Sequence, residues 1–422
     1  MAALSMLQGI LVVRLVGIDG LGVVTTVTVF VSNIHRLLSF RMSEVVVRFL
    51  GAALARGDQR QGAAVVRWAV GWECSTSLAA MVILAGLAPW GAQVLLKNPG
   101  SVGLIWLYGL VLLGNLVYET STGILQSLRR FDRLAQINII QSLLTFCLVV
   151  FAFGFHKGVP VLVTAYLAGK LFAGLAVAWL AARSMVKSFG AGWWRLAIEE
   201  SGFGRRLFSF AVNTNLQSTV NLLVRDNVPL LLGGLRSQIE VGYFKLALSI
   251  INLIMLPIDP LIGPTYTEIS QTIANRMWTQ TRQLLQRVSL VAAAWTITAG
   301  AGVALLAPWL IPLMYGFEAA PAYPAVMILL VGYGFANILN WNRPLLLALG
   351  RPVIPLVTSA ILGLAALGFT FWLVPKFGYT VQAGILSAYF VGTITITVWR
   401  GLAELHKQAI LDREGQADGG LT

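Results

Sequence analysis

Long apolar stretches recur along the 422-residue chain and are separated by short segments that carry most of its charge. Hydrophobic residues make up 57% of the chain and charged residues 11%, and the mean hydropathy is +0.78. An α-helix needs about 20 apolar residues to cross a bilayer. Because backbone groups in lipid must be satisfied internally, and because these stretches are too long and too uniformly apolar for barrel strands, we expect an all-α membrane protein.

Twelve apolar windows fit transmembrane helices. They form two sets of six, at residues 1–14, 20–40, 63–88, 102–127, 134–154 and 160–182, and at residues 206–235, 239–262, 288–312, 324–347, 354–373 and 382–403. The expected organisation is an N-terminal six-helix lobe (1–183), a cytoplasmic interfacial linker (184–205), a C-terminal six-helix lobe (206–405) and a cytoplasmic tail (406–422). The first window is short for a span, so we expect that the first helix is truncated.

The distribution of Lys and Arg predicts the orientation, because positive residues concentrate on the cytoplasmic side of a membrane. With the N-terminus inside, the inner segments hold twenty-one Lys and Arg residues and the outer segments hold seven. We therefore expect both termini in the cytoplasm. The net charge of +13 then reflects topology rather than binding of nucleic acid.

Matching residues recur at a nearly constant offset between the two halves. Gly20 is followed by Gly242, and Arg129 by Arg351, in each case 222 residues later and at the same place in the predicted topology. Such matches indicate an internal duplication. Six spans in each half would insert in the same orientation, so the sequence predicts two pseudo-symmetric lobes related by an axis along the membrane normal.

The seventh window carries a polar residue at every fourth position. These residues are Ser209, Asn213, Gln217, Asn221 and Arg225. This spacing places all five on one face of a helix. Polar groups in hydrocarbon are costly, so the face is expected to line a wet cavity, and hydrogen bonding between helices is the alternative.

Other ionisable residues lie inside or at the ends of predicted spans. The cations are Arg36, Lys170, Lys245 and Arg343, and the carboxylates are Glu73, Glu119 and Asp226. Arg and Lys suit phosphate, and amides and hydroxyls suit sugars, whereas a site for organic cations would need carboxylates and an aromatic cage. Glu73 or Glu119 could equally serve as a structural partner for Lys170.

The sequence offers little support for an enzyme. It has no P-loop, its acidic residues on the outer side have no paired spacing, and Cys74 and Cys147 have neither metal nor disulfide spacing. We therefore expect no metal and no cofactor.

Several segments resemble a known family. They are Arg14–Gly22 (RLVGIDGLG), Gly123–Arg133 (GILQSLRRFDR), Gly242–Ala247 (GYFKLA) and Leu347–Pro352 (LALGRP). In this order they are similar to segments of bacterial polysaccharide and O-antigen flippases, which belong to the multidrug/oligosaccharidyl-lipid/polysaccharide exporter (MOP) superfamily. Ile18, Asp19 and Leu21 depart from the usual pattern of the first segment.

The resemblance implies a MATE-like V of two lobes with a central cationic cavity that opens alternately to either side. It also implies that the chain moves an undecaprenyl-diphosphate-linked oligosaccharide across the bacterial inner membrane for surface polysaccharide or lipopolysaccharide synthesis, alongside a polysaccharide polymerase and glycosyltransferases. The candidate substrate contacts are Arg225, Lys245, Arg36, Asn213, Gln217, Asn221, Lys170 and Arg343. The candidates for coupling to H⁺ or Na⁺ are Glu73, Glu119 and Asp226. The alternative is a multidrug or organic-cation antiporter of the same superfamily, in which carboxylates would carry transport.

Overall fold

The computed structural model describes residues 2–39, 41–190, 192–195, 204–205, 207–208, 211–212, 222 and 226–419. Every element within these residues is helical. Ten of the helical stretches found there are long and apolar enough to cross a membrane. The chain is therefore an all-helical, multi-pass membrane protein.

These ten stretches correspond to eleven of the twelve predicted spans. The windows 1–14 and 20–40 fall together in α1 (Ala2–Leu38), in which Gly17 has a non-helical backbone with φ 73° and ψ 179°. Nine further windows each coincide with one stretch. Half of the seventh window, 206–235, lies outside the described residues, and among those described there only α10 (Val228–Leu235) is a continuous helix.

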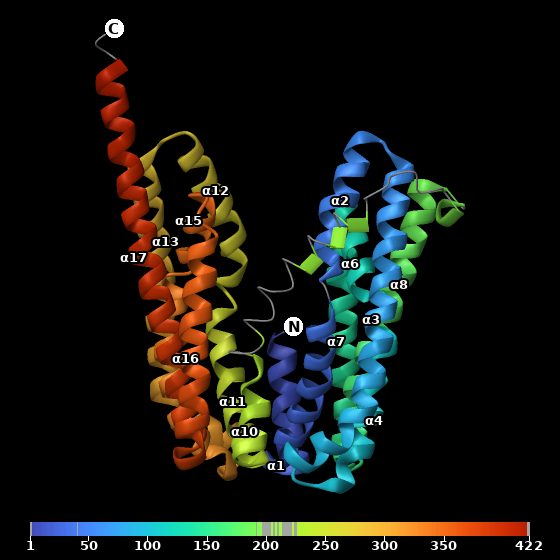
Figure 1. Ribbon diagram of the computed structural model, residues 1–422. Helices are drawn as coiled ribbons and strands as arrows, with labels where there is room; N and C mark the ends of the chain where they lie inside the picture. The colour runs from blue at the N-terminus through green and yellow to red at the C-terminus, as the bar shows by residue number, and fades with distance from the viewer. Residues whose placement is uncertain are drawn as a thin grey trace. The chain divides into compact units, whose positions relative to one another are not determined.

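The chain divides into two compact units, Ala3–Gly242 and Tyr243–Thr422. Within each unit the long helices run side by side along a common direction (Figure 1). The first unit holds α1, α2 (Met42–Arg56), α3 (Gln59–Val94), α4 (Val102–Gly109), α5 (Val111–Gly114), α6 (Tyr118–Ser127), α7 (Phe131–Gly154), α8 (Val159–Phe189), α10 and the start of α11 (Gln238–Met255). The second holds the rest of α11, then α12 (Ile262–Ala274), α13 (Trp278–Tyr315), α14 (Tyr323–Ile338), α15 (Asn342–Ala348), α16 (Val353–Phe377) and α17 (Tyr379–Gly419).

The boundary between the two units lies after Gly242, whereas the sequence predicts that the second lobe begins at residue 206. Residues 206–242 therefore belong to the first unit. Residues 184–189, assigned to the linker from the sequence, continue α8. Much of the segment from 191 to 225 lies outside the described residues, so the predicted lobes at 1–183 and 206–405 stay a prediction.

Corresponding helices in the two units end with the same hydrogen bonds. After α6, the N–H groups of Arg129 and Arg130 donate to the carbonyls of Gln126 and Leu125; after α15, those of Gly350 and Arg351 donate to Leu347 and Leu346. Both ends are Schellman motifs, in which one residue adopts the left-handed conformation. That residue is Arg129 (φ 57°) in one unit and Gly350 (φ 71°) in the other. Arg351 therefore corresponds to Arg130, one residue away from the match made by sequence.

The two units also build their apolar cores from corresponding helices. In the first, Val46 of α2, Val66 of α3, Leu125 of α6 and Val177 of α8 belong to one buried cluster. In the second, a buried cluster contains Ile269 of α12, Leu285 of α13, Leu345 of α15 and Leu405 of α17. Each unit thus packs a short helix, two long helices and a helix with a Schellman end into one cluster, and the duplication itself stays a prediction.

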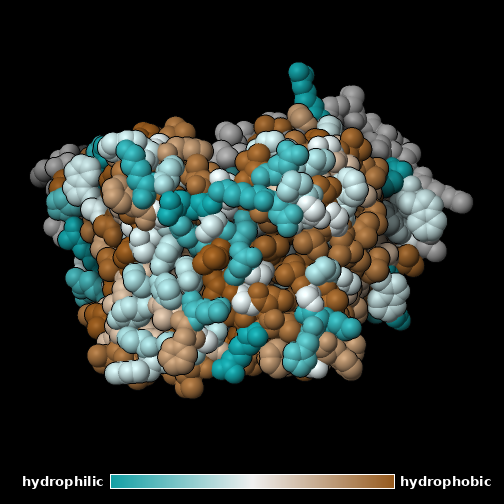
Figure 2. All heavy atoms as spheres, turned by 90° about the horizontal axis from the view of Figure 1, so that it is seen from below, coloured by the Kyte–Doolittle hydropathy of each residue, from teal (hydrophilic) through white to brown (hydrophobic). Residues whose placement is uncertain are grey.

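Many large apolar side chains lie on the surface. Val82, Leu290 and Leu364 are all strongly exposed and lie in candidate spans, as lipid-facing residues do. Viewed along the helices, hydrophilic side chains gather on the end face, and hydrophobic ones cover much of its edge (Figure 2). This distribution fits helices that leave the bilayer at this end.

Candidate functional site

A row of polar contacts joins the second half of α1 to residues 226–242 within the first unit. Arg36 forms an ion pair with Asp226 (Nη1 to Oδ2, 2.7 Å), and the Asn33 amide donates to the Asn227 side-chain oxygen at 2.5 Å. Further along, the Thr26 hydroxyl donates to Oε1 of Gln238 at 2.7 Å. From the first pair to the third, the partner on α1 moves back from residue 36 to residue 26, while the partner on the other segment moves forward from residue 226 to residue 238. The two segments therefore lie antiparallel. We call these three pairs the polar row.

The backbones of the two segments approach closely at one end of the polar row. A Cβ atom on Gly22 would lie 1.9 Å from the carbonyl oxygen of Gln238, and one on Gly242 would lie 2.3 Å from that of Ile18. Only glycine fits such contacts, because a Cβ atom needs more than about 3 Å. The glycines therefore hold the start of α11 against α1.

Burial changes along the polar row. Thr26, Asn33 and Gln238 are buried, and Gln238 also donates from Nε2 to the carbonyl of Leu95 at 2.5 Å. Arg36 and Asp226 keep 53% and 31% of their side-chain surface exposed. Buried polar groups are stable only when hydrogen-bonded, so the row is a dry, specific contact at one end and a solvent-accessible ion pair at the other.

Glu73 and Glu119 are held by the protein itself. The Glu73 carboxylate is 1% exposed and accepts the backbone N–H groups of Glu119 (2.7 Å) and Thr120 (2.9 Å) in the first turn of α6. The Glu119 carboxylate accepts from the hydroxyl of Ser43 at 2.7 Å. A carboxylate at this end of a helix satisfies otherwise unpaired N–H groups and complements the helix dipole. The coupling role predicted for both residues stays a prediction.

The remaining candidate cations lie at separate places. Lys170 is exposed on α8, and among the described residues no ion pair joins it to Glu73 or Glu119. Arg343 is exposed on α15. Lys245 is exposed on α11, where its helical spacing from Ser249 and Asn252 gives one polar face inside a candidate span.

Four predicted substrate contacts, Asn213, Gln217, Asn221 and Arg225, lie outside the described residues. Of the predicted residues, the structure brings together Arg36 with Asp226. It adds Thr26, Asn227 and Gln238, which the sequence did not single out. Their signal was weak, because single Thr and Asn residues are common in membrane helices and Gln238 stands at the start of a span.

Among the described residues, no group of three His, Cys, Asp or Glu side chains could hold a metal ion. The polar row instead consists of amides, a hydroxyl and one ion pair. Such groups can hydrogen-bond polar molecules and attract charged ones.

Solved structures show the class of fold. The chain matches an inward-facing multidrug resistance MATE family transporter of the MOP superfamily with a TM-score of 0.75 and 15% identity, over 96% of this chain and 95% of that one. It matches the lipid II flippase MurJ, in an inward closed conformation, with a TM-score of 0.74 and 12% identity, over 97% and 88%. A MOP superfamily transporter from Pyrococcus furiosus, described as having a binding pocket of reversed polarity, matches with a TM-score of 0.63 and 14% identity, over 96% and 91%. The fold is that of MOP superfamily transporters.

A sequence profile identifies the family within this fold. The profile of the polysaccharide biosynthesis protein family matches residues 11–323. The chain belongs to that family, which confirms the resemblance seen in the sequence. Among curated proteins, none matched this chain.

Proposed function

We propose that this protein is a flippase that moves an undecaprenyl-diphosphate-linked oligosaccharide across the bacterial cytoplasmic membrane during surface polysaccharide synthesis, such as that of O-antigen. In this proposal the chain has twelve spans in two pseudo-symmetric lobes and both termini in the cytoplasm. The predicted seventh span, residues 206–235, is the one that is not among the ten candidates. The protein would act between glycosyltransferases, which build the oligosaccharide, and a polymerase, which extends it.

The polar row is the observation that carries the proposal. A transporter that alternates between two states needs contacts that are specific when made and can be broken. Hydrogen bonds between Thr26 and Gln238 and between Asn33 and Asn227 meet this need better than an apolar seam would. The ion pair of Arg36 and Asp226 adds a charged end that a polyanionic substrate could compete for, because both side chains are partly exposed.

The chemistry of the exposed polar face on α11 also fits such a substrate. Lys245 would bind diphosphate or acidic sugars, and Ser249 and Asn252 would hydrogen-bond sugar hydroxyls. Arg225, Asn213, Gln217 and Asn221 are proposed to extend this function along the seventh span, and Lys170 and Arg343 are further candidates for anion binding.

Deletion of the gene in its host tests the substrate. We expect surface polysaccharide to be lost and lipid-linked oligosaccharide to accumulate, with its glycan protected from glycosidases added outside the cell. Wild-type protein should restore both, and Arg225→Ala or Lys245→Ala should restore them poorly. Normal surface polysaccharide in the deletion strain, with a new sensitivity to organic cations, would support the alternative, a multidrug antiporter.

The described carboxylates do not favour that alternative. Glu73 is enclosed and accepts two backbone hydrogen bonds, and Glu119 accepts one from Ser43. A cation-binding role would require these groups to leave their partners, which costs about 1–3 kcal/mol for each unsatisfied buried group.

A charge exchange tests the polar row directly. Arg36→Asp and Asp226→Arg should each lower export, because each places like charges opposite one another. The two substitutions together restore opposite charges and should recover much of the export. Full export by both single variants would show that transport does not need the ion pair.

A further inference from the structure

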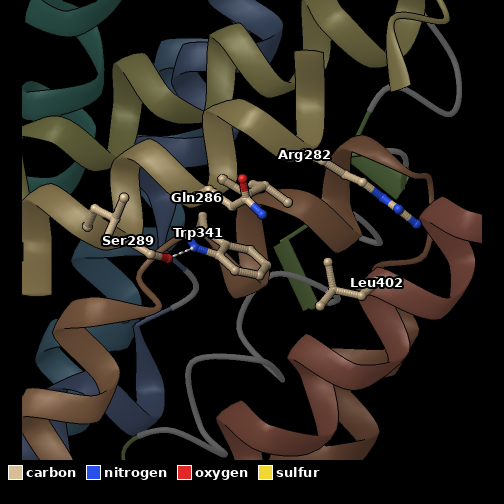
Figure 3. A pocket seen from close by; sticks show the side chains of 7 residues that line it. Arg282, Gln286, Ser289, Trp341 and Leu402 are labelled. Atoms are coloured by element: carbon tan, nitrogen blue, oxygen red, sulfur yellow. Dashed lines mark hydrogen bonds between the residues drawn. The ribbon is translucent and has the colours of Figure 1, made fainter. Parts of the chain in front are cut away.

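A cavity of about 620 Å³ lies within the second unit, where α13, α17 and the bend between α14 and α15 meet (Figure 3). Its walls are mainly Leu285 and Leu290 of α13, Trp341 of the bend and Leu402 of α17. The indole N–H of Trp341 donates to the Ser289 hydroxyl at 2.6 Å, which satisfies the ring's polar group. The volume is within the range of about 300–1,000 Å³ that is usual for small-molecule sites.

Strongly exposed apolar side chains surround the opening of the cavity. Leu290 is 69% exposed and shares one face of α13 with Ile297 and Leu305, which are also strongly exposed. Leu402 is 39% exposed on α17. Leu290 and Leu402 belong to candidate spans, so the opening is placed to adjoin acyl chains in the proposal below.

One end of the cavity carries a positive charge. Arg282 lies at the opposite end from Ser289 (Figure 3), and its Nη2 lies 3.2 Å from Nδ1 of His406. An imidazole carries no negative charge, so this contact leaves the guanidinium charge uncompensated. The nearby Glu404 and Asp412 pair with Arg351 and Arg276, and among the described residues no carboxylate forms an ion pair with Arg282.

This end of the cavity also has the character of a membrane interface. Trp399, one turn before Leu402, is exposed, and the Arg400 guanidinium lies 5.0 Å from its ring centre. Trp and Arg concentrate at the depth of lipid headgroups. Arg282 and the apolar walls therefore present a cation at headgroup depth beside space for a hydrocarbon chain.

We propose that this cavity binds an anionic phospholipid, with its phosphate at Arg282 and one acyl chain against Leu285, Leu290, Trp341 and Leu402. Basic pockets between membrane helices bind anionic headgroups in this way. The single guanidinium in the lining matches the single charge of a phosphodiester, whereas a diphosphate carrier lipid would need more cations. The site is independent of the transported substrate.

Native mass spectrometry of the purified full-length protein tests the charge. We expect phosphatidylglycerol to bind about five- to tenfold more tightly than phosphatidylcholine with the same chains, since one Arg contributes about 1 kcal/mol near anionic lipid. Arg282→Gln should remove this preference. The matched control is Arg287→Gln, an exposed Arg on the same helix that does not line the cavity, and it should keep the preference. Equal binding of the two lipids, an unchanged Arg282→Gln variant, or an equal loss in Arg287→Gln would overturn the proposal.

A second arm tests the cavity. Leu402→Trp should fill it and weaken phosphatidylglycerol binding, while Leu411→Trp, at an exposed apolar position on the same helix outside the cavity, should not. Undecaprenyl diphosphate added at equal concentration should leave the bound lipid in place. Displacement would assign the cavity to the carrier lipid and overturn the proposal. The surface variant Arg282→Gln decides the question if Leu402→Trp fails to fold.

Discussion

Glu73 shows how a buried carboxylate in a membrane helix can be structural. Its oxygens replace the backbone acceptors that the first turn of α6 lacks, and they do so from α3, a different helix. The interaction fixes where α6 begins after the short break at residues 115–117. A single residue therefore links the positions of two helices in the first unit.

Replacement of Glu73 by Gln tests this role. The amide keeps one acceptor but places its NH₂ group among N–H donors, so we expect stability to fall by about 1–3 kcal/mol. Thermal unfolding of purified protein in detergent measures the change. Glu44→Gln is the control, because Glu44 pairs with Arg41 near the surface, and loss of such a pair costs about 0–1 kcal/mol. Equal midpoints for the two variants would contradict a structural role for Glu73.

The left-handed residues after α6 and α15 give a second prediction at this scale. A non-glycine residue in this conformation costs about 1 kcal/mol. Arg129→Gly should therefore stabilise the protein by about that amount, and Gly350→Ala should destabilise it similarly. Thermal unfolding in detergent checks both variants. If both variants raise the stability, or both lower it, Arg129 and Gly350 are not equivalent positions.

At the scale of elements, the pairing of α1 with residues 226–242 depends on backbone contact at Gly22. Gly22→Ala should force the segments apart, because the new Cβ would overlap the Gln238 carbonyl. To measure the pairing, Cys74 and Cys147 are replaced by Ser, and cysteines are introduced at positions 33 and 227 in place of Asn33 and Asn227. A short thiol cross-linker then joins these two cysteines when the segments are paired. We expect the yield of cross-linked protein to be several-fold lower with Gly22→Ala.

Gly9→Ala provides the matched control for that experiment. Gly9 is also in α1, but a Cβ atom there would meet no other atom within 4 Å. Its cross-linking yield should equal that of the parent. An unchanged yield in Gly22→Ala would mean that the pairing does not depend on the close approach.

The elements themselves were predicted well where hydrophobicity alone determines them. Nine windows each coincide with one candidate span, since about 20 apolar residues dictate a membrane helix. The breaks within spans were not predicted. The window 102–127 contains α4, α5 and α6, and the break after Gly114 coincides with packing against Gly174 of α8, where a Cβ atom would lie 2.2 Å from the Gly114 carbonyl oxygen. No local pattern carries that information.

The candidate site was predicted in part for the same reason. The cost of a charge in lipid identified Arg36, Glu73 and Asp226 as residues that need a partner or a cavity. The identity of each partner depends on tertiary packing, as Arg36 and Asp226 are 190 residues apart. Sequence reasoning could therefore name the polar residues but not the polar row.

At the scale of the whole molecule, the charge distribution predicts the orientation in the membrane. In a background with Cys74 and Cys147 replaced by Ala, a cysteine at Asn98 should react with an impermeant thiol reagent in intact cells. A cysteine at Asp132 should react only after permeabilisation. Both positions are exposed, so access to the reagent depends on the side of the membrane. The opposite labelling pattern would reverse the topology.

The glycine contacts at Gly22 and Gly242 also bear on how fast such a molecule can change state. Interlocked side chains must pass through eclipsed torsions before two helices can part, whereas backbone against backbone has no torsion to change. If the two segments separate during each cycle, the activation barrier at this point comes from the few hydrogen bonds of Thr26, Gln238 and Leu95. Repeated opening would then require few side chains to repack at this point.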